Sequence, residues 1–127
     1  MYACNLLEND TNAPSPWLRW GPAFNGLHSV LAFHTEALDS NPFVSDFAVG
    51  FLGFPPFLAP QTIVQAWLNA ANATDIGTPA AMGPVFNLDV GGFTLGICDY
   101  ADYYWGKGTV GPTLPQELIN GWWYIKG

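Results

Sequence analysis

Cys4 carries the side chain best suited to nucleophilic chemistry. Residues 1–4 form an apolar stretch that ends on Cys4, and the polar residues Asn5, Glu8 and Asn9 follow within one short segment. A cysteine at the carboxyl end of a strand, where the chain opens into a loop, is where α/β hydrolases place a nucleophile. As a thiolate, Cys4 would attack a carbonyl carbon while backbone N–H groups hold the oxyanion. The alternative is that Cys4 is a small buried apolar residue.

His34 occupies the equivalent position after a second apolar run, residues 29–33. Neighbouring parallel strands lie about 4.8 Å apart, so Cys4 and His34 would share one rim of a parallel sheet. There they would form a thiolate–imidazolium pair, with His34 as the base. The alternative is a solvated histidine in a loop. His28 precedes the same run, and we expect it to be structural, with its ring bonded to a backbone carbonyl.

Two helices are predicted between these residues and the middle of the chain. Asn41-Pro42 is a capping residue followed by proline, which is typical of a helix start. Phenylalanines then recur at four-residue spacing until Gly53. A second apolar stripe predicts another helix, and residues 72–83 are expected to be a loop. The stripe consists of Ile63, Val64, Trp67, Leu68 and Ala71.

Residues 85–90 and 93–98 flank Gly91-Gly92, which predicts a two-residue hairpin. The remaining tail, residues 99–127, is rich in aromatic residues, glycine and proline, and we expect an ordered but irregular wrap over the core. Strands and helices alternate in the first half of the chain. The alternation predicts an α/β fold with a partial, mostly parallel sheet and covering helices, followed by the hairpin and the tail. We expect one domain over residues 1–127, with a strand/helix core at 1–82 and the hairpin and tail at 83–127.

The composition excludes several kinds of partner. Only three residues are basic against ten acidic ones, and the net charge is −7, which argues against nucleic acids and anionic membranes. The longest apolar stretch, residues 43–58, is broken by Asp46, Pro55 and Pro56, so no membrane span is expected. Charged residues make up only 10% of the chain. We therefore expect one of two surfaces. Either another protein chain or further copies of this chain cover much of the surface, or it consists largely of neutral polar residues.

No cofactor or metal site is expected from the spacing of histidine, cysteine and acidic residues. Asp99 and Asp102 lie near three tyrosines and would line a polar cleft, bind calcium weakly, or belong to a solvated loop. Trp105, Trp122 and Trp123 are candidates for an interface or for stacking on a ligand. The alternative for all three is packing in the core.

The order of these segments resembles the second half of the caspase-like cysteine peptidases, especially the CHAT-type and uncharacterised bacterial and archaeal branches. The resemblance covers residues 1–71. It rests on a strand ending in Ala-Cys, a Gly-x-x-Ser-Val segment that opens the next strand, and two following helices. The segments that carry it are Tyr2-Ala3-Cys4-Asn5, Phe24-Asn25-Gly26-Leu27-His28-Ser29-Val30-Leu31-Ala32-Phe33, Asp39, Phe47-Ala48, Phe51-Leu52 and Ile63-Val64-Gln65-Ala66-Trp67.

The resemblance implies that Cys4 is the nucleophile and that the end of the second strand lines the substrate pocket, with Thr35, Glu36 and Asp39. In that family the general base is a histidine in a His-Gly step before the cysteine, which this chain does not contain. The chain is therefore expected to be a fragment of a larger caspase-like domain, inactive alone, with a structural or associative role. Completed by an upstream His-Gly segment, it would hydrolyse peptides.

A second interpretation is a secreted module that self-assembles or binds carbohydrate or protein. Cys4 and Cys98 would then form a disulfide, which favours an extracellular location. Asn9 and Asn72 begin sequences that fit the glycosylation sequon. The state of the two thiols distinguishes the interpretations, because two free thiols are typical of an intracellular protein.

Overall fold

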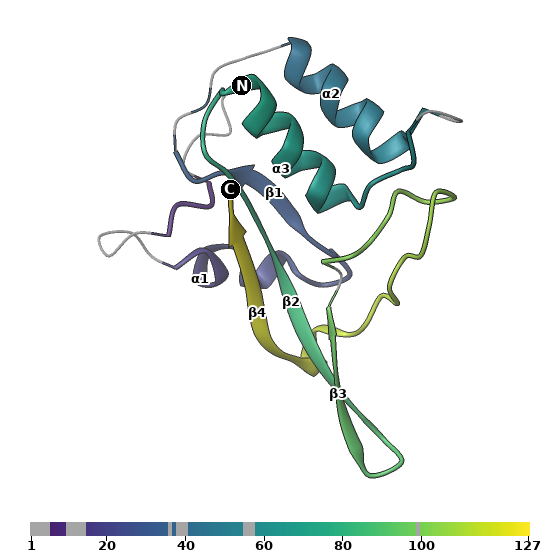
Figure 1. The fold of residues 1–127 in the computed structure, drawn as a ribbon. Helices are drawn as coiled ribbons and strands as arrows, with labels where there is room; N and C mark the ends of the chain where they lie inside the picture. The colour runs from purple at the N-terminus through teal and green to yellow at the C-terminus, as the bar shows by residue number, and fades with distance from the viewer. Residues whose placement is uncertain (1–5, 10–14, 36, 38–40, 55–57, 99) are drawn as a thin grey trace.

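The structure is a computed structural model of the 127-residue chain, and it describes residues 6–9, 15–35, 37, 41–54, 58–98 and 100–127. Three α-helices, two short 3-10 helices and four strands make up the described fold (Figure 1). In chain order they are α1 (Pro16–Trp20), η1 (Gly21–Ala23), β1 (Val30–Phe33), α2 (Asn41–Leu52), α3 (Ile63–Thr74), β2 (Pro79–Val90), β3 (Phe93–Cys98), η2 (Gln116–Leu118) and β4 (Ile119–Lys126).

The sheet is organised around β2, which pairs with each of the other three strands. Along one edge β2 pairs first with β1, where Ala80 lies opposite Ala32, and then with β3, where Phe86 lies opposite Ile97. Along its other edge it pairs with β4 over most of its length. All three pairings are antiparallel.

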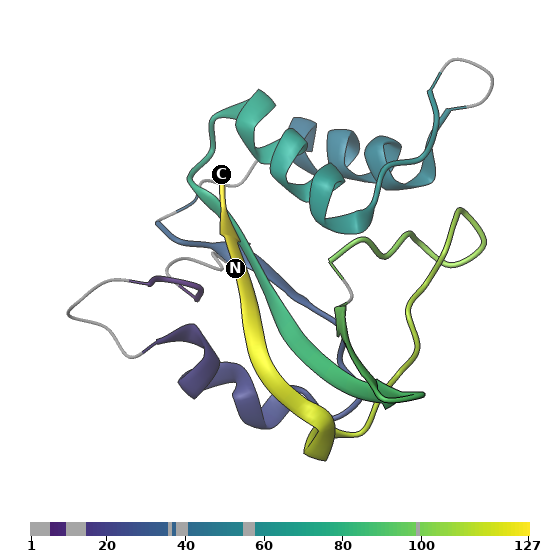
Figure 2. The ribbon, with the colours of Figure 1, turned by 60° about the horizontal axis from the view of Figure 1, so that its bottom comes forward.

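Helices cover both faces of this sheet (Figure 2). Alternate residues of each strand contribute to opposite faces, as the pleat requires. In β1, Phe33 packs in the core under α3, whereas Ala32 packs in the core on the α1 side. In β4, Trp123 joins the α3 side and Trp122 joins the α1 side. The strands are therefore apolar on both faces.

The prediction of a mostly parallel sheet was wrong, since every described pairing is antiparallel. A continuous apolar run such as residues 29–33 is typical of parallel strands because helices usually bury both of their faces. Here an antiparallel sheet is buried on both faces, so its strands have the same composition. The direction of pairing is decided by residues 79–126, far along the chain.

Both predicted long helices are confirmed. α2 follows the predicted Asn41-Pro42 start and ends before Gly53, which has a positive φ of 75°. α3 begins after Thr62, whose side-chain oxygen accepts a hydrogen bond from the backbone N–H of Gln65. It ends at Asp75, whose left-handed φ of 50° stops the helix. Rings from α2 pack on Trp67 of α3, and Trp67 in turn packs on Phe33 of β1.

The hairpin is also confirmed, and Gly91 and Gly92 have φ values of 58° and 86°. Positive φ at both positions is what a two-residue hairpin turn requires. Two other expectations were wrong. Residues 72–74 belong to α3 and residues 79–83 to β2 rather than to a loop, and the tail contains the regular strand β4. β2 crosses the expected division between residues 82 and 83, and the predicted strand at residues 1–4 lies outside the described residues.

Candidate functional site

The carboxyl end of β1 holds His34 in a hydrogen-bonded cluster with the N-terminal segment. The backbone N–H of Asn9 donates to His34 Nδ1 at 3.1 Å, and the hydroxyl of Tyr124 lies 3.2 Å from the same nitrogen. The Tyr124 hydroxyl donates to the carbonyl oxygen of Leu7 at 2.7 Å. Because Nδ1 accepts from a backbone N–H, a neutral His34 carries its proton on Nε2.

The same segment also runs beside β1 itself, since the N–H of Leu7 donates to the carbonyl of Phe33 at 3.3 Å. Leu7 is fully buried in the core on the α1 side. Arg19 of α1 donates to the carbonyl of Glu8. Burial raises the pKa of Tyr124, and the nearby Arg19 charge opposes that rise. The cluster therefore keeps the tyrosine in its neutral, hydrogen-bonding form.

Three of the predicted site residues, Cys4, Glu36 and Asp39, lie outside the described residues. Thr35 is described, and its hydroxyl accepts a hydrogen bond from the backbone N–H of Thr78 at 3.0 Å. Cys98 is exposed at the end of β3 and forms no disulfide with a described residue, while Cys4 lies outside them. The disulfide between Cys4 and Cys98 stays a prediction.

A second polar cluster precedes the amino end of β1 and is built around His28. His28 Nδ1 lies 2.7 Å from Asp102 Oδ2, and His28 Nε2 lies 2.8 Å from the Thr113 hydroxyl. The other carboxylate oxygen of Asp102 accepts the backbone N–H of Gly111 at 2.7 Å. His28 was expected to bond to a backbone carbonyl; two side chains from the 100–113 segment bind its ring nitrogens.

The fold holds Asp102 through its backbone as well as its side chain. Its carbonyl oxygen accepts the N–H of Ile63, the first residue of α3, at 2.9 Å. The neighbouring Tyr103 donates its N–H to the carbonyl of Thr109 at 3.0 Å, which closes the loop on itself. The loop over residues 100–113 is thus fixed to the start of α3 and to the segment that precedes β1.

The three candidate tryptophans occupy different environments. Trp122 is partly buried and packs on Phe24, with ring centroids 5.2 Å apart. Trp123 is also partly buried on the opposite face and packs on Tyr100 at 5.3 Å. Trp105 is 85% exposed.

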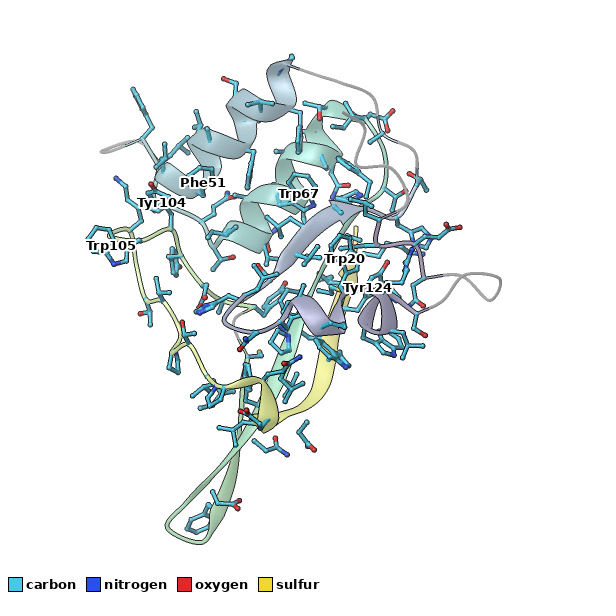
Figure 3. The ribbon with its side chains drawn as sticks, turned by 180° about the vertical axis from the view of Figure 1, so that it is seen from behind. Trp20, Phe51, Trp67, Tyr104, Trp105 and Tyr124 are labelled. Atoms are coloured by element: carbon cyan, nitrogen blue, oxygen red, sulfur yellow. The ribbon has the colours of Figure 1, made fainter. Side chains whose placement is uncertain are left out.

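Trp105 belongs to an exposed group of large apolar residues that we call the apolar edge. Figure 3 shows Phe51, Tyr104 and Trp105 together at one margin of the molecule, beyond Trp67. Phe51 and Tyr104 are in ring contact, with centroids 5.2 Å apart. The hairpin-like bridge between Phe54 and Leu58 follows α2 directly. The members of the apolar edge are Val49, Leu52, Phe54, Leu58, Tyr104 and Trp105, all of them exposed.

Two hollows adjoin the apolar edge. A groove of about 270 Å³ lies between α2 and α3, with Val49 and Leu58 in its lining and Asp46, Gln61 and Asn69 as polar members. A smaller hollow of about 200 Å³ has four lining residues in the described part of the chain, Phe47, Phe51, Ile63 and Tyr104. Such apolar concavities are typical of binding sites.

Within the described residues, no three histidine, cysteine or acidic side chains gather in a way that would hold a metal ion. No helix in the described part of the chain is long and apolar enough to cross a membrane. The candidate sites in the described part of the chain are the two histidine clusters and the apolar edge.

A family model described as "Domain of unknown function (DUF6345)" matches residues 1–127. The chain belongs to this family. No curated protein and no solved structure matches the DUF6345 chain. The family description states no activity, so the resemblance to caspase-like peptidases stays a prediction.

Proposed function

We propose that this DUF6345 domain acts by association, and that the apolar edge binds a segment of another protein chain. The observation that carries the proposal is that Tyr104 and the exposed Trp105 lie with Phe51 at one margin of the molecule, beside an apolar hollow that Tyr104 and Phe51 line (Figure 3). The other exposed apolar members belong to the last turns of α2 and the residues that follow it, where two of them line the groove. Large exposed apolar side chains beside an apolar hollow are typical of interaction sites in soluble proteins. Tyrosine and tryptophan are the residues enriched in such interfaces.

The packing below the apolar edge supports a binding role. Trp67, Phe47 and Phe51 form a chain of ring contacts that leads from the buried core to Tyr104. Tyr104 and Trp105 are further held by the closed loop over residues 103–109 and by the anchoring of Asp102. Preorganised aromatic side chains lose little conformational entropy on binding, which favours affinity.

The expected occupant is an apolar protein segment with basic flanks rather than a second copy. Two copies would each bring a net charge of −7, and like charges disfavour association. The apolar edge itself carries almost no charge; Asp46 lines the groove, and Lys107 follows Trp105 closely in the sequence. Basic flanks on the partner would therefore be attracted by the molecule as a whole.

Peptide selection from a random library tests this proposal. Peptides are selected on the wild-type domain and counter-selected on Trp105→Ser. We expect enriched peptides with apolar centres and basic flanks, whose affinity falls at least about tenfold on Trp105→Ser or Leu58→Ser. Leu18→Ser is the matched control, because Leu18 is 71% exposed on α1, away from the apolar edge.

Two results would contradict the proposal. One is a set of peptides that bind Trp105→Ser as tightly as the wild-type domain. The other is a concentration-dependent dimer in gel filtration that Trp105→Ser abolishes, which would assign the apolar edge to a second copy.

A second candidate function, cysteine-nucleophile hydrolysis, is favoured by the cluster at His34. The segment that follows Cys4 in the sequence, residues 6–9, is bonded to β1 at its carboxyl end and to the His34 ring. A general base from another segment would complete such a site. In this candidate Cys4 contributes the thiol, and His34 pairs with it as a thiolate–imidazolium couple.

Alkylation of the native protein by iodoacetamide across a pH series tests the second candidate. An activated Cys4 is labelled faster than Cys98 below about pH 7, and His34→Ala slows labelling of Cys4 alone. Equal labelling rates for the two thiols, unchanged in His34→Ala, would refute it. Cys98 serves as the internal control, since it is exposed.

A further inference from the structure

We propose that Thr113, His28 and Asp102 form an acyl-transfer site, in which Thr113 is the nucleophile, His28 the general base and Asp102 the residue that orients the base. The site contains no residue of the apolar edge and does not involve Cys4, although Asp102 also anchors the loop that carries Tyr104 and Trp105. Asp102 and Thr113 follow His28 by 74 and 85 residues in the chain. Sequence spacing therefore gave no signal for it.

The hydrogen bonds give the site a defined direction of proton transfer. An ionised carboxylate only accepts hydrogen bonds, so the 2.7 Å contact with Asp102 places the proton of a neutral His28 on Nδ1. Nε2 then carries a lone pair and accepts the Thr113 hydroxyl proton across 2.8 Å. A hydroxyl nucleophile is activated in this way when a general base lies within hydrogen-bond distance of it and a third group holds the base in place.

Burial decreases from the acid to the nucleophile. The side chain of Asp102 is 13% exposed and that of His28 is 23% exposed, whereas Thr113 lies on the surface. The carboxylate is fixed by the Gly111 N–H, and the histidine ring cannot rotate away without breaking its contact with that carboxylate. A substrate would reach the Thr113 hydroxyl from solvent while the supporting groups remain shielded.

The reaction is transfer of an acyl group from an ester to Thr113. Thr113 Oγ1 forms a bond to the ester carbonyl carbon as its proton passes to His28 Nε2. The bond from that carbon to the leaving oxygen then breaks, and His28 returns the proton to the leaving alcohol. Water, with His28 again as base, releases the acid and restores the threonine.

The expected substrate is a small, neutral ester. Thr113 carries a secondary hydroxyl next to its own methyl group, which disfavours bulky acyl groups. Gly26 lies beside that methyl group, where an added Cβ would be 3.7 Å from it. The net charge of −7 disfavours anionic esters.

The test uses p-nitrophenyl acetate in the full chain with Cys4→Ser and Cys98→Ser, so that thiols do not accept the acetyl group. We expect peptide mapping to find the acetyl group on Thr113. Thr113→Val should abolish that modification and lower nitrophenolate release at least about tenfold, while Thr113→Ser retains both. Asp102→Asn and His28→Gln should lower release by about a hundredfold, in the range for loss of a general base.

Thr109→Ala is the matched control, since Thr109 is another exposed threonine of the same loop. It should leave acetylation and nitrophenolate release unchanged. Acetylation of His28 instead of Thr113, or equal release by Thr113→Val and its parent, would overturn the assignment. Thr113→Val and Thr113→Ser change only an exposed side chain, so they test the site even if variants of Asp102 or His28 unfold.

Discussion

The two ends of β1 each place a histidine among hydrogen-bonding groups, and the two clusters are built differently. At the carboxyl end, His34 receives a backbone N–H from Asn9 and lies beside a tyrosine hydroxyl. At the amino end, His28 bonds to a carboxylate through one nitrogen and to a hydroxyl through the other. The first arrangement joins a segment of backbone to the sheet, and the second creates a path for a proton.

The difference shows that a ring's partners, rather than its position at a strand end, determine what chemistry it supports. His34 has the position expected of a base in an α/β hydrolase, whereas His28 has the partners. Asp102, which the His28 cluster requires, also ties the loop carrying Tyr104 and Trp105 to α3. The amino end of β1 therefore supports both the apolar edge and the acyl-transfer site.

The largest loss of stability is expected for a substitution at Gly83, which follows Met82, the β2 residue paired with the first residue of β1. A Cβ there would meet the carbonyl oxygen of His28 at 2.7 Å and the ring nitrogen of Trp123 at 2.6 Å. Gly83→Ala should lower the free energy of unfolding by about 1–3 kcal/mol, as overpacking does. Urea denaturation measures it, with Gly121→Ala in the adjacent β4 as control, because no described atom lies within 4 Å of its added Cβ. If Gly83→Ala left the free energy of unfolding unchanged, this end of β1 would not be tightly packed.

Asp102→Ala should destabilise by about 2 kcal/mol, because it leaves the Gly111 N–H and the His28 ring without their acceptor. Asp46→Ala is the matched control on the exposed face of α2, and its effect should stay within about 0.5 kcal/mol. Urea unfolding compares the two. A loss equal to that of Asp46→Ala would mean that the carboxylate does not hold the loop.

Tyr124→Phe tests the carboxyl end and should cost about 1 kcal/mol, since it removes one hydrogen bond to Leu7. Burial raises the pKa of Tyr124 in the folded state above its unfolded value of about 10. Its contribution is therefore fully present below about pH 10 and is lost as pH rises through the folded pKa. Urea unfolding at about pH 9 and pH 11 should show a smaller decline for Tyr124→Phe than for the wild-type chain. An equal decline in the free energy of unfolding for both proteins would show that ionisation of Tyr124 does not cause the loss of stability.

Local patterns predicted the parts of this fold that local interactions decide. Phenylalanines at four-residue spacing, the Asn41-Pro42 start and the Gly91-Gly92 turn each act within a few residues, and α2 and the hairpin formed as expected. Strand β4 was missed because its alternate residues pack into opposite cores. Trp122 and Trp123 are both apolar, so no period of two was visible in its sequence.

The sites depended on pairings that no local pattern encodes. The parallel arrangement that would join Cys4 and His34 required a strand direction that the sequence did not determine. The His28 cluster needed Asp102, which was noted only as a member of an acidic pair near tyrosines, and Thr113, which stands in an unremarkable stretch. Both become partners of His28 only once the 100–113 segment crosses the start of β1.

Because β2 pairs with β1, β3 and β4, its three pairings form at different times as the chain is synthesised. Residues 79–90 are made after β1 but well before β4, so one edge of β2 is open until residues 119–126 have left the ribosome. The unpaired backbone N–H and C=O groups along such a strand are a template for pairing with other chains. Nascent chains stalled shortly after the hairpin should therefore depend on chaperones, and chains released there should aggregate.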